Sequence, residues 1–118
     1  MKILTVDDSK VDLINIQNIL TDAGYQVITA TSGQEAIDKA NAEKPDLIFL
    51  DVVMQEMDGY HVCRELTHQD ATKGIPIVFV TAKGQKADRV WAEMTGAKGL
   101  VQKPYTPEQI IEQVNQLK

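Results

Sequence analysis

The stretch LTVDDS, residues 4–9, joins a strand-like apolar run to two adjacent carboxylates. A carboxylate is costly to remove from water, so a pair of carboxylates directly after a buried strand needs a physical reason. A second apolar run, residues 47–50, ends in the same way at Asp51. These strand ends are the starting point for predicting both the fold and the function.

Five short apolar runs recur along the chain, each followed by a longer segment with helical spacing. The runs span residues 3–6, 27–30, 47–50, 77–80 and 99–102. They are apolar almost throughout, which is typical of strands in a parallel sheet covered by helices on both faces. The sequence therefore predicts an α/β fold with five strand–helix units, in one domain spanning residues 1–118 and without an output domain.

The first predicted helix begins after Ser9, a suitable N-cap, and ends before Gly24. Its predicted apolar face comprises Val11, Leu13, Ile14, Ile16, Leu20 and Ala23.

Later helices carry their own start signals. Ser32 with Glu35, and Thr106 with Gln109, have the spacing of a capping box. The fourth predicted helix has apolar residues at helical spacing, among them Trp91, so this side chain either packs on the sheet or anchors a partner.

Composition narrows the class of protein. The 118 residues carry a net charge of -5, which disfavours binding to a phosphate backbone, so we expect no nucleic-acid partner. A single cysteine, Cys63, cannot form an intramolecular disulfide, and the first residues resemble no leader, so we expect a cytoplasmic protein. No apolar run reaches the roughly 20 residues of a membrane span, so we expect no membrane insertion.

Polar residues follow four of the five predicted strands. Asp7 and Asp8 follow the first, Asp51 the third, Thr81 the fourth and Lys103 the fifth. The carboxyl ends of parallel strands share one edge of the sheet. If the first and third strands are neighbours, as in doubly wound sheets of order 2-1-3-4-5, these residues converge at the point where such folds bind ligands.

Three carboxylates and one ammonium sum to -2, and clustered like charges need a counter-ion. Oxygen ligands favour Mg²⁺, which uses one or two carboxylates and keeps several waters. A carboxylate beside Mg²⁺ can also act as a nucleophile toward phosphorus. We expect this role for Asp51, with Lys103 and the Thr81 hydroxyl binding the transferred oxygens.

The pattern of residues resembles the receiver domain of two-component response regulators over the whole chain. The residues that carry the resemblance are Asp7 with Asp8, Asp51 followed by Met54, the sequence MDG at residues 57–59, Thr81 with Ala82, and Lys103 with Pro104. The resemblance implies a flavodoxin-like (βα)5 sheet of order 2-1-3-4-5. It also implies that Asp51 is the phosphoacceptor, that Asp8, Asp51 and the Val53 carbonyl ligate Mg²⁺, and that Asp7 holds metal-bound water.

The resemblance further implies a switch. Lys103 would pair with the phosphoryl group, Thr81 would move toward it, and the bond before Pro104 would be cis, as in many receivers. Two departures affect this expectation. Gln55 replaces the usual proline of the loop, and Leu100 replaces the Tyr or Phe that rotates inward in many receivers. The switch and output residues are therefore predicted to be Thr81, Ala82, Trp91, Leu100 and Pro104.

The predicted function is a stand-alone response regulator that accepts a phosphoryl group from a histidine kinase or phosphotransfer domain. It would then bind a downstream protein. The segment around Trp91 is similar to the small receivers of type IV pilus, or twitching-motility, chemosensory systems, and a chemotaxis-like or other phosphorelay shuttle stays open. We expect a monomer, leave open a dimer on phosphorylation, and expect no enzyme activity beyond Mg²⁺-dependent self-phosphorylation and autodephosphorylation.

Four alternative functions compare with the sequence as follows. A pseudo-receiver scaffold or a phosphate sink without strong conformational output remains compatible with Leu100. A phosphohydrolase with an aspartate nucleophile would want a second aspartate two residues after Asp51, where Val53 stands. A nucleotide-binding role lacks both the GxxxxGK[ST] loop and the GxGxxG turn.

Overall fold

The computed structural model describes residues 1–52, 59–82 and 95–118. Five parallel strands form one sheet in the order β2-β1-β3-β4-β5. The strands are β1 (Lys2–Val6), β2 (Gln26–Ala30), β3 (Leu47–Asp51), β4 (Ile77–Thr81) and β5 (Gly99–Gln102). The predicted α/β class and strand order are confirmed.

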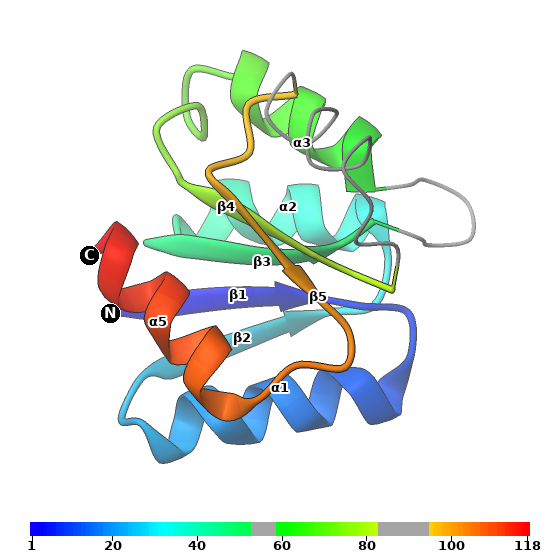
Figure 1. Cartoon of the computed structure of the whole chain (residues 1–118). Helices are drawn as coiled ribbons and strands as arrows, with labels where there is room; N and C mark the ends of the chain where they lie inside the picture. Colours follow the sequence, from blue (N-terminus) through cyan, green and yellow to red (C-terminus); the bar gives the residue numbers. More distant parts are fainter. Residues whose placement is uncertain (53–58, 83–94) are drawn as a thin grey trace.

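Four helices in the described residues cover the sheet: α1 (Lys10–Asp22), α2 (Gly33–Glu43), α3 (Gly59–His68) and α5 (Pro107–Leu117). Figure 1 shows α2 and α3 on one face, with α1 and α5 on the other. The helix predicted between β4 and β5, with Trp91, falls outside the described residues.

The sheet separates two apolar clusters, because successive side chains of a strand point to opposite faces. On β3, Ile48 and Leu50 pack with the α2 and α3 side chains, while Leu47 and Phe49 pack with those of α1 and α5. Strands with both faces buried explain why the sequence runs are apolar throughout rather than alternating.

The predicted start of α1 is confirmed, and the predicted apolar face is partly wrong. The Ser9 hydroxyl accepts a hydrogen bond from the Asp12 N–H (3.4 Å). Leu13, Ile16 and Leu20 are buried, because a spacing of three and four residues places them on one side of a helix. Val11 and Ile14 of the predicted face are exposed because they lie off that side, and Ala23 is exposed at the C-cap, beyond the last helical residue.

The two predicted capping boxes differ in detail. At α5 both reciprocal bonds between Thr106 and Gln109 are present. At α2 the Ser32 hydroxyl accepts from the Glu35 N–H, but the Glu35 carboxylate accepts from the Thr31 N–H instead of the Ser32 N–H. The Glu35 carboxylate still accepts from a backbone N–H just before the helix, so the pair of residues still stabilises the helix start.

Gly59 holds the first turn of α3 against the end of β3. Its N–H donates to the Val52 carbonyl (2.8 Å). A Cβ at this position would lie 2.4 Å from the Asp51 carbonyl oxygen and 2.8 Å from the Val52 Cα. Both atoms belong to the backbone of the sheet edge, so they cannot yield as a flexible side chain would.

We expect Gly59→Ala to lower the free energy of unfolding by roughly 1–3 kcal/mol, the usual cost of forcing extra atoms into a packed site. Gly74→Ala is the matched control, because a Cβ there meets nothing within 4 Å. Urea unfolding of both variants measures the difference. Equal stability of G59A and wild type would show that the end of β3 moves away without cost.

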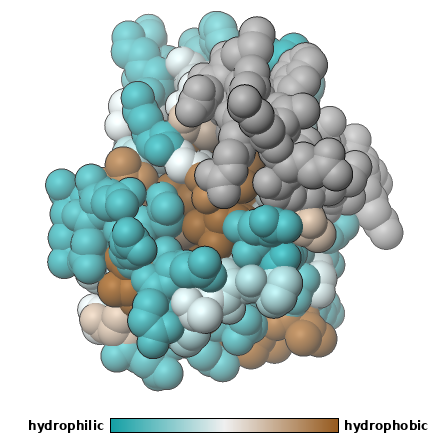
Figure 2. Space-filling model, viewed as in Figure 1, coloured by the Kyte–Doolittle hydropathy of each residue, from teal (hydrophilic) through white to brown (hydrophobic). Residues whose placement is uncertain are grey.

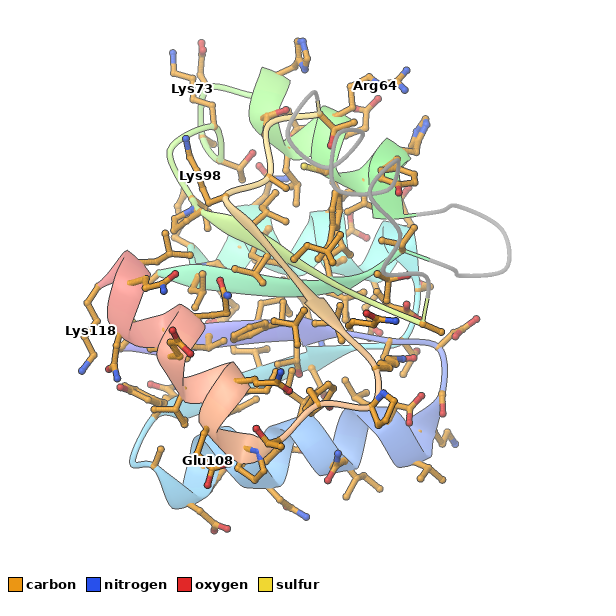
Figure 3. The ribbon with its side chains drawn as sticks, viewed as in Figure 1. Arg64, Lys73, Lys98, Glu108 and Lys118 are labelled. Atoms are coloured by element: carbon orange, nitrogen blue, oxygen red, sulfur yellow. The ribbon has the colours of Figure 1, made fainter. Side chains whose placement is uncertain are left out.

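Many charged side chains lie on the outside of the molecule. Arg64, Lys73, Lys98, Glu108 and Lys118 point away from the sheet (Figure 3). Hydrophilic residues cover much of the visible face, with an apolar area over α1 (Figure 2). None of the helices in the described ranges has the length and apolar character that a membrane span requires. Both chain termini lie beside the sheet edge at which β1 begins, opposite the strand ends that carry Asp7 and Asp51 (Figure 1).

Candidate functional site

Three carboxylates meet at the carboxyl ends of β1 and β3. One ligand oxygen from each of Asp7, Asp8 and Asp51 lies within 4.8 Å of the other two. The side chains of Asp7 and Asp51 are buried, whereas Asp8 is exposed. β1 and β3 are hydrogen-bonded neighbours, and this pairing brings residues 44 positions apart in sequence to one place. The sheet thus concentrates negative charge where the predicted ligand site lies.

Lys103 reaches this cluster from the end of β5. Its Nζ donates to Asp7 Oδ2 (2.9 Å) and lies 3.8 Å from Asp51 Oδ2. Its backbone N–H donates to the Thr81 carbonyl (2.7 Å), which fixes the backbone where the side chain leaves β5. The peptide bond between Lys103 and Pro104 is cis, as the family resemblance implied.

The electrostatic environment favours the charged form of Lys103. Burial alone would lower the pKa of its ammonium, but hydrogen bonds to Asp7 and Asp12 and the charge of Asp51 outweigh burial and raise the pKa. Lys103 therefore stays protonated throughout the neutral range. Its charge is a fixed part of the site.

Asp12 is a member of the site that the sequence reasoning missed. Its Oδ2 accepts a hydrogen bond from Lys103 Nζ (3.1 Å). Four carboxylates and one ammonium give a charge of -3, rather than the -2 expected without Asp12. A signal was present in the sequence: Asp12 lies four residues after Asp8 in the first turn of a predicted helix, one helical turn from the strand end.

The residues of the site fit a magnesium ion. All three clustered side chains offer the oxygen ligands that Mg²⁺ prefers, and one oxygen of each lies within 4.8 Å of the other two. Asp7 is already engaged on both oxygens, because Oδ1 accepts from the Ser9 N–H (2.9 Å) and Oδ2 from Lys103. The direct ligation of Mg²⁺ by Asp8 and Asp51 and the water-holding role of Asp7 stay predictions.

The predicted switch residues that the structure describes differ in their burial. Thr81 ends β4 and is buried, and Ala82 directly after it is exposed. Leu100 lies on β5 in register with Phe79 and is buried in the cluster on the α2 and α3 face. Pro104 is exposed.

Some predicted residues lie outside the described part of the chain. These are Val53, whose carbonyl was expected to bind the metal, the loop residue Gln55, and Trp91 of the predicted output face. Their roles stay predictions.

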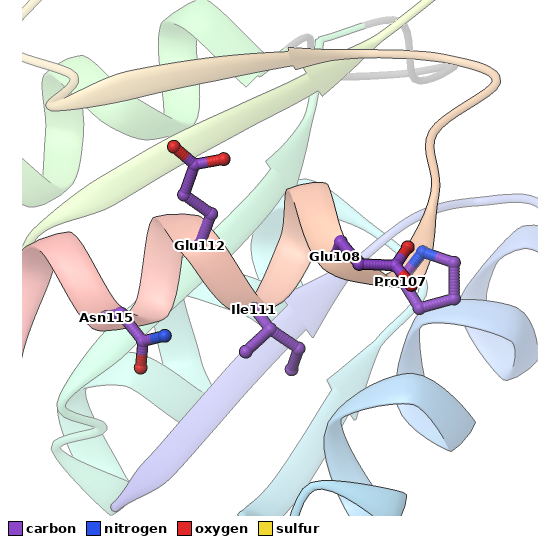
Figure 4. A pocket seen from close by; sticks show the side chains of 5 residues that line it. All are labelled: Pro107, Glu108, Ile111, Glu112 and Asn115. Atoms are coloured by element: carbon purple, nitrogen blue, oxygen red, sulfur yellow. The ribbon is translucent and has the colours of Figure 1, made fainter.

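A separate hollow lies on α5, away from the carboxylates. It has a volume of about 470 Å³, and Figure 4 shows the side chains that line it: Pro107, Glu108, Ile111, Glu112 and Asn115. None of these is a predicted site residue. The acidic site and this hollow are therefore distinct features of the surface.

Comparison with known proteins agrees with the fold and the family resemblance. Residues 3–115 match the response regulator receiver domain family. Protein PilH of Pseudomonas aeruginosa strain PAO1 is 35% identical over 114 residues, which cover 97% of this chain and 94% of PilH. The transcriptional regulatory protein PhoP of Bacillus subtilis strain 168, which acts in alkaline phosphatase synthesis, is 42% identical over 109 residues. That match covers 92% of this chain but only 45% of PhoP.

Solved structures of similar proteins have the same fold as this chain. The Vibrio cholerae chemotaxis protein CheY4 superposes with a TM-score of 0.94 at 32% identity, covering 99% of this chain and 98% of CheY4. The family resemblance predicted from the strand-end residues is thus confirmed by sequence and by fold. The chain is a member of the response regulator receiver domain family.

Proposed function

We propose that the chain is a phosphorylation-controlled signalling switch in which Asp51 accepts a phosphoryl group from a histidine kinase or phosphotransfer domain. The observation that carries this proposal is the grouping of the Asp51 carboxylate with Asp7, Asp8 and Lys103 at one sheet edge. An isolated carboxylate has no means of neutralising an incoming phosphate. This grouping supplies an ammonium and a set of metal ligands.

In the transfer step, an oxygen of the Asp51 carboxylate attacks the phosphorus of the donor. An O–P bond forms, the bond between phosphorus and the donor's imidazole nitrogen breaks, and the nitrogen keeps the bonding electron pair. Lys103 Nζ pairs with the transferred oxygens, and the Thr81 hydroxyl donates to one of them. The product is an acyl phosphate on Asp51.

Mg²⁺, held by Asp8, Asp51 and the Val53 carbonyl, would supply electrostatic neutralisation of the phosphoryl oxygens during transfer. Asp7 would orient a water of the metal, since its two oxygens already bind Ser9 and Lys103.

The output is a change in partner binding. Phosphorylation adds charge at the end of β3 and biases a two-state equilibrium. Shifting such an equilibrium from mostly off to mostly on takes about 5.5 kcal/mol. Thr81 carries the change to β5 through its contact with the Lys103 backbone. Leu100 is already buried, and this favours a second candidate function, a phosphate sink with weak conformational output.

For the pathway we propose chemotaxis-like control of type IV pilus motility, supported by the sequence of residues 80–99 and by similarity to PilH over nearly the whole of both chains. The chain would act in the cytoplasm as a monomer, bind a downstream protein rather than nucleic acid, and have no enzyme activity toward other substrates.

The test is incubation with phosphoramidate and Mg²⁺, followed by intact-protein mass spectrometry. We expect one added phosphoryl group, labile to hydroxylamine, and no sustained hydrolysis of p-nitrophenyl phosphate. Removing Mg²⁺ with EDTA should slow the gain of mass about 100-fold or more, because a divalent metal contributes several kcal/mol to such a transition state. A protein that gains no phosphoryl group with Mg²⁺ would be a scaffold instead.

A further inference from the structure

We propose that Asp12 is a positioning residue that holds the Lys103 ammonium away from Asp51 until Asp51 is phosphorylated. This inference rests on the proposed function, since it concerns the rate at which Asp51 acquires its phosphoryl group. It assigns a role to a residue outside the predicted site.

The distances around Lys103 Nζ define two close partners and one distant partner. Asp7 Oδ2 lies at 2.9 Å and Asp12 Oδ2 at 3.1 Å, both within hydrogen-bond range. Asp51 Oδ2 lies at 3.8 Å, beyond that range. An ammonium has three donor hydrogens, and two of them are used on Asp7 and Asp12. The two short hydrogen bonds of Lys103 thus go to Asp7 and Asp12, while its contact with Asp51 is a longer ion pair.

The two close partners differ in how easily Lys103 can leave them. The Asp7 side chain is 8% exposed, whereas the Asp12 side chain is 45% exposed. A hollow of about 350 Å³, lined in part by Asp12, Asn15 and Lys103, opens this side of the ammonium to water. Water can solvate the Asp12 carboxylate once the ion pair breaks, but it cannot do so as well for Asp7. Asp12 is the partner that Lys103 gives up.

A phosphoryl group on Asp51 brings new anionic oxygens toward Lys103 Nζ. Asp12 competes with them for the same ammonium, so the transfer step includes the loss of the ion pair between Asp12 and Lys103. A partly exposed ion pair of this kind is worth a factor of about two to five in an equilibrium or a rate. Removing the Asp12 charge should therefore raise the phosphorylation rate by about that factor.

The experiment compares four forms of the full chain with phosphoramidate and Mg²⁺: wild type, Asp12→Asn, Asp12→Glu and Asp22→Asn. Asp22 lies at the far end of the same helix and is exposed, so D22N matches the change in net charge. We expect D12N to gain phosphate about two- to fivefold faster than wild type. D22N should match wild type, and D12E should restore the wild-type rate because it restores the ion pair.

A double-mutant cycle shows whether Asp12 acts through Lys103 or through its charge alone. In a Lys103→Met background, D12N should change the rate by less than a factor of about 1.5, since no ammonium is left to restrain. Initial rates followed over hours by intact mass keep these slower variants measurable. A D12N effect of unchanged size in the K103M background would overturn the proposal, as would a D12N rate equal to or below that of wild type.

Failure of this inference is distinguishable from failure of the proposed function. If wild type gains no phosphoryl group, the proposed function fails. If wild type is phosphorylated but D12N behaves like D22N, only the role of Asp12 is wrong. Thermal unfolding of each variant checks that the rates compare folded proteins.

Discussion

Replacing Asp51 with Asn should abolish phosphorylation by phosphoramidate, with no mass gain under conditions that fully modify wild type. The amide nitrogen and oxygen of Asn are poor nucleophiles toward phosphorus, and D51N removes the carboxylate that ends β3 within the cluster of Asp7, Asp8 and Asp51. Intact mass and peptide mapping after hydroxylamine treatment locate any modified residue.

The same variant should gain stability in the absence of Mg²⁺. Asp7, Asp8 and Asp51 repel one another, and D51N removes one of these charges while leaving Lys103 with two close partners. We expect the free energy of unfolding to rise by roughly 1 kcal/mol, a typical gain when a strained functional site is neutralised.

Asp38→Asn on α2 is the control for a simple change in net charge. Phosphorylation of D51N at the wild-type rate would place the acceptor at another residue. A loss of stability in D51N would show that attraction to Lys103 outweighs the repulsion within the cluster.

Replacing Lys103 with Met should lower the free energy of unfolding by about 2–3 kcal/mol at pH 7 without Mg²⁺. Breaking a buried ion pair costs 3–5 kcal/mol, and the partial exposure of Lys103 reduces that value. The cause is the buried carboxylates of Asp7 and Asp51, which lose their compensating charge. Urea unfolding measures the effect, with Lys98→Met as a control at an exposed lysine.

Two further readouts test the electrostatic cause. Mg²⁺ should stabilise K103M more than wild type, because the carboxylates of K103M lack another counter-charge. The difference between wild type and K103M should narrow as pH rises above 10.5, the ordinary pKa of lysine. The folded-state pKa of Lys103 is raised, so its contribution is complete below that pH and is lost as pH climbs toward the folded-state value. A difference independent of both Mg²⁺ and pH would indicate lost packing instead.

Most of the fold was predictable because strands buried on both faces leave a distinct pattern. The sequences of β3 and β4 contain no polar residue before their last position, whereas a half-exposed strand alternates apolar and polar residues. The strand order was not predictable from periodicity, since pairing depends on contacts between distant residues. It came from the family resemblance.

The errors at the site and in α1 have physical causes. Val11 and Ile14 are apolar but exposed, and hydrophobicity alone does not show which apolar residues of a helix face the sheet. Asp12 was missed because its role depends on the position of the Lys103 ammonium group. The sequence does not show which way a flexible lysine side chain extends. Asp7, Asp8 and Asp51 were found because they lie at the carboxyl ends of β1 and β3, where the backbone fixes the position.

The location of the two chain termini has a practical consequence. Both lie beside the amino ends of the strands, on the side of the molecule opposite the acidic edge (Figure 1). A fluorescent protein or an affinity tag fused at either end would therefore leave access for a kinase unobstructed. We expect such a labelled chain to serve in live-cell imaging and pull-down assays that test the proposed phosphorylation.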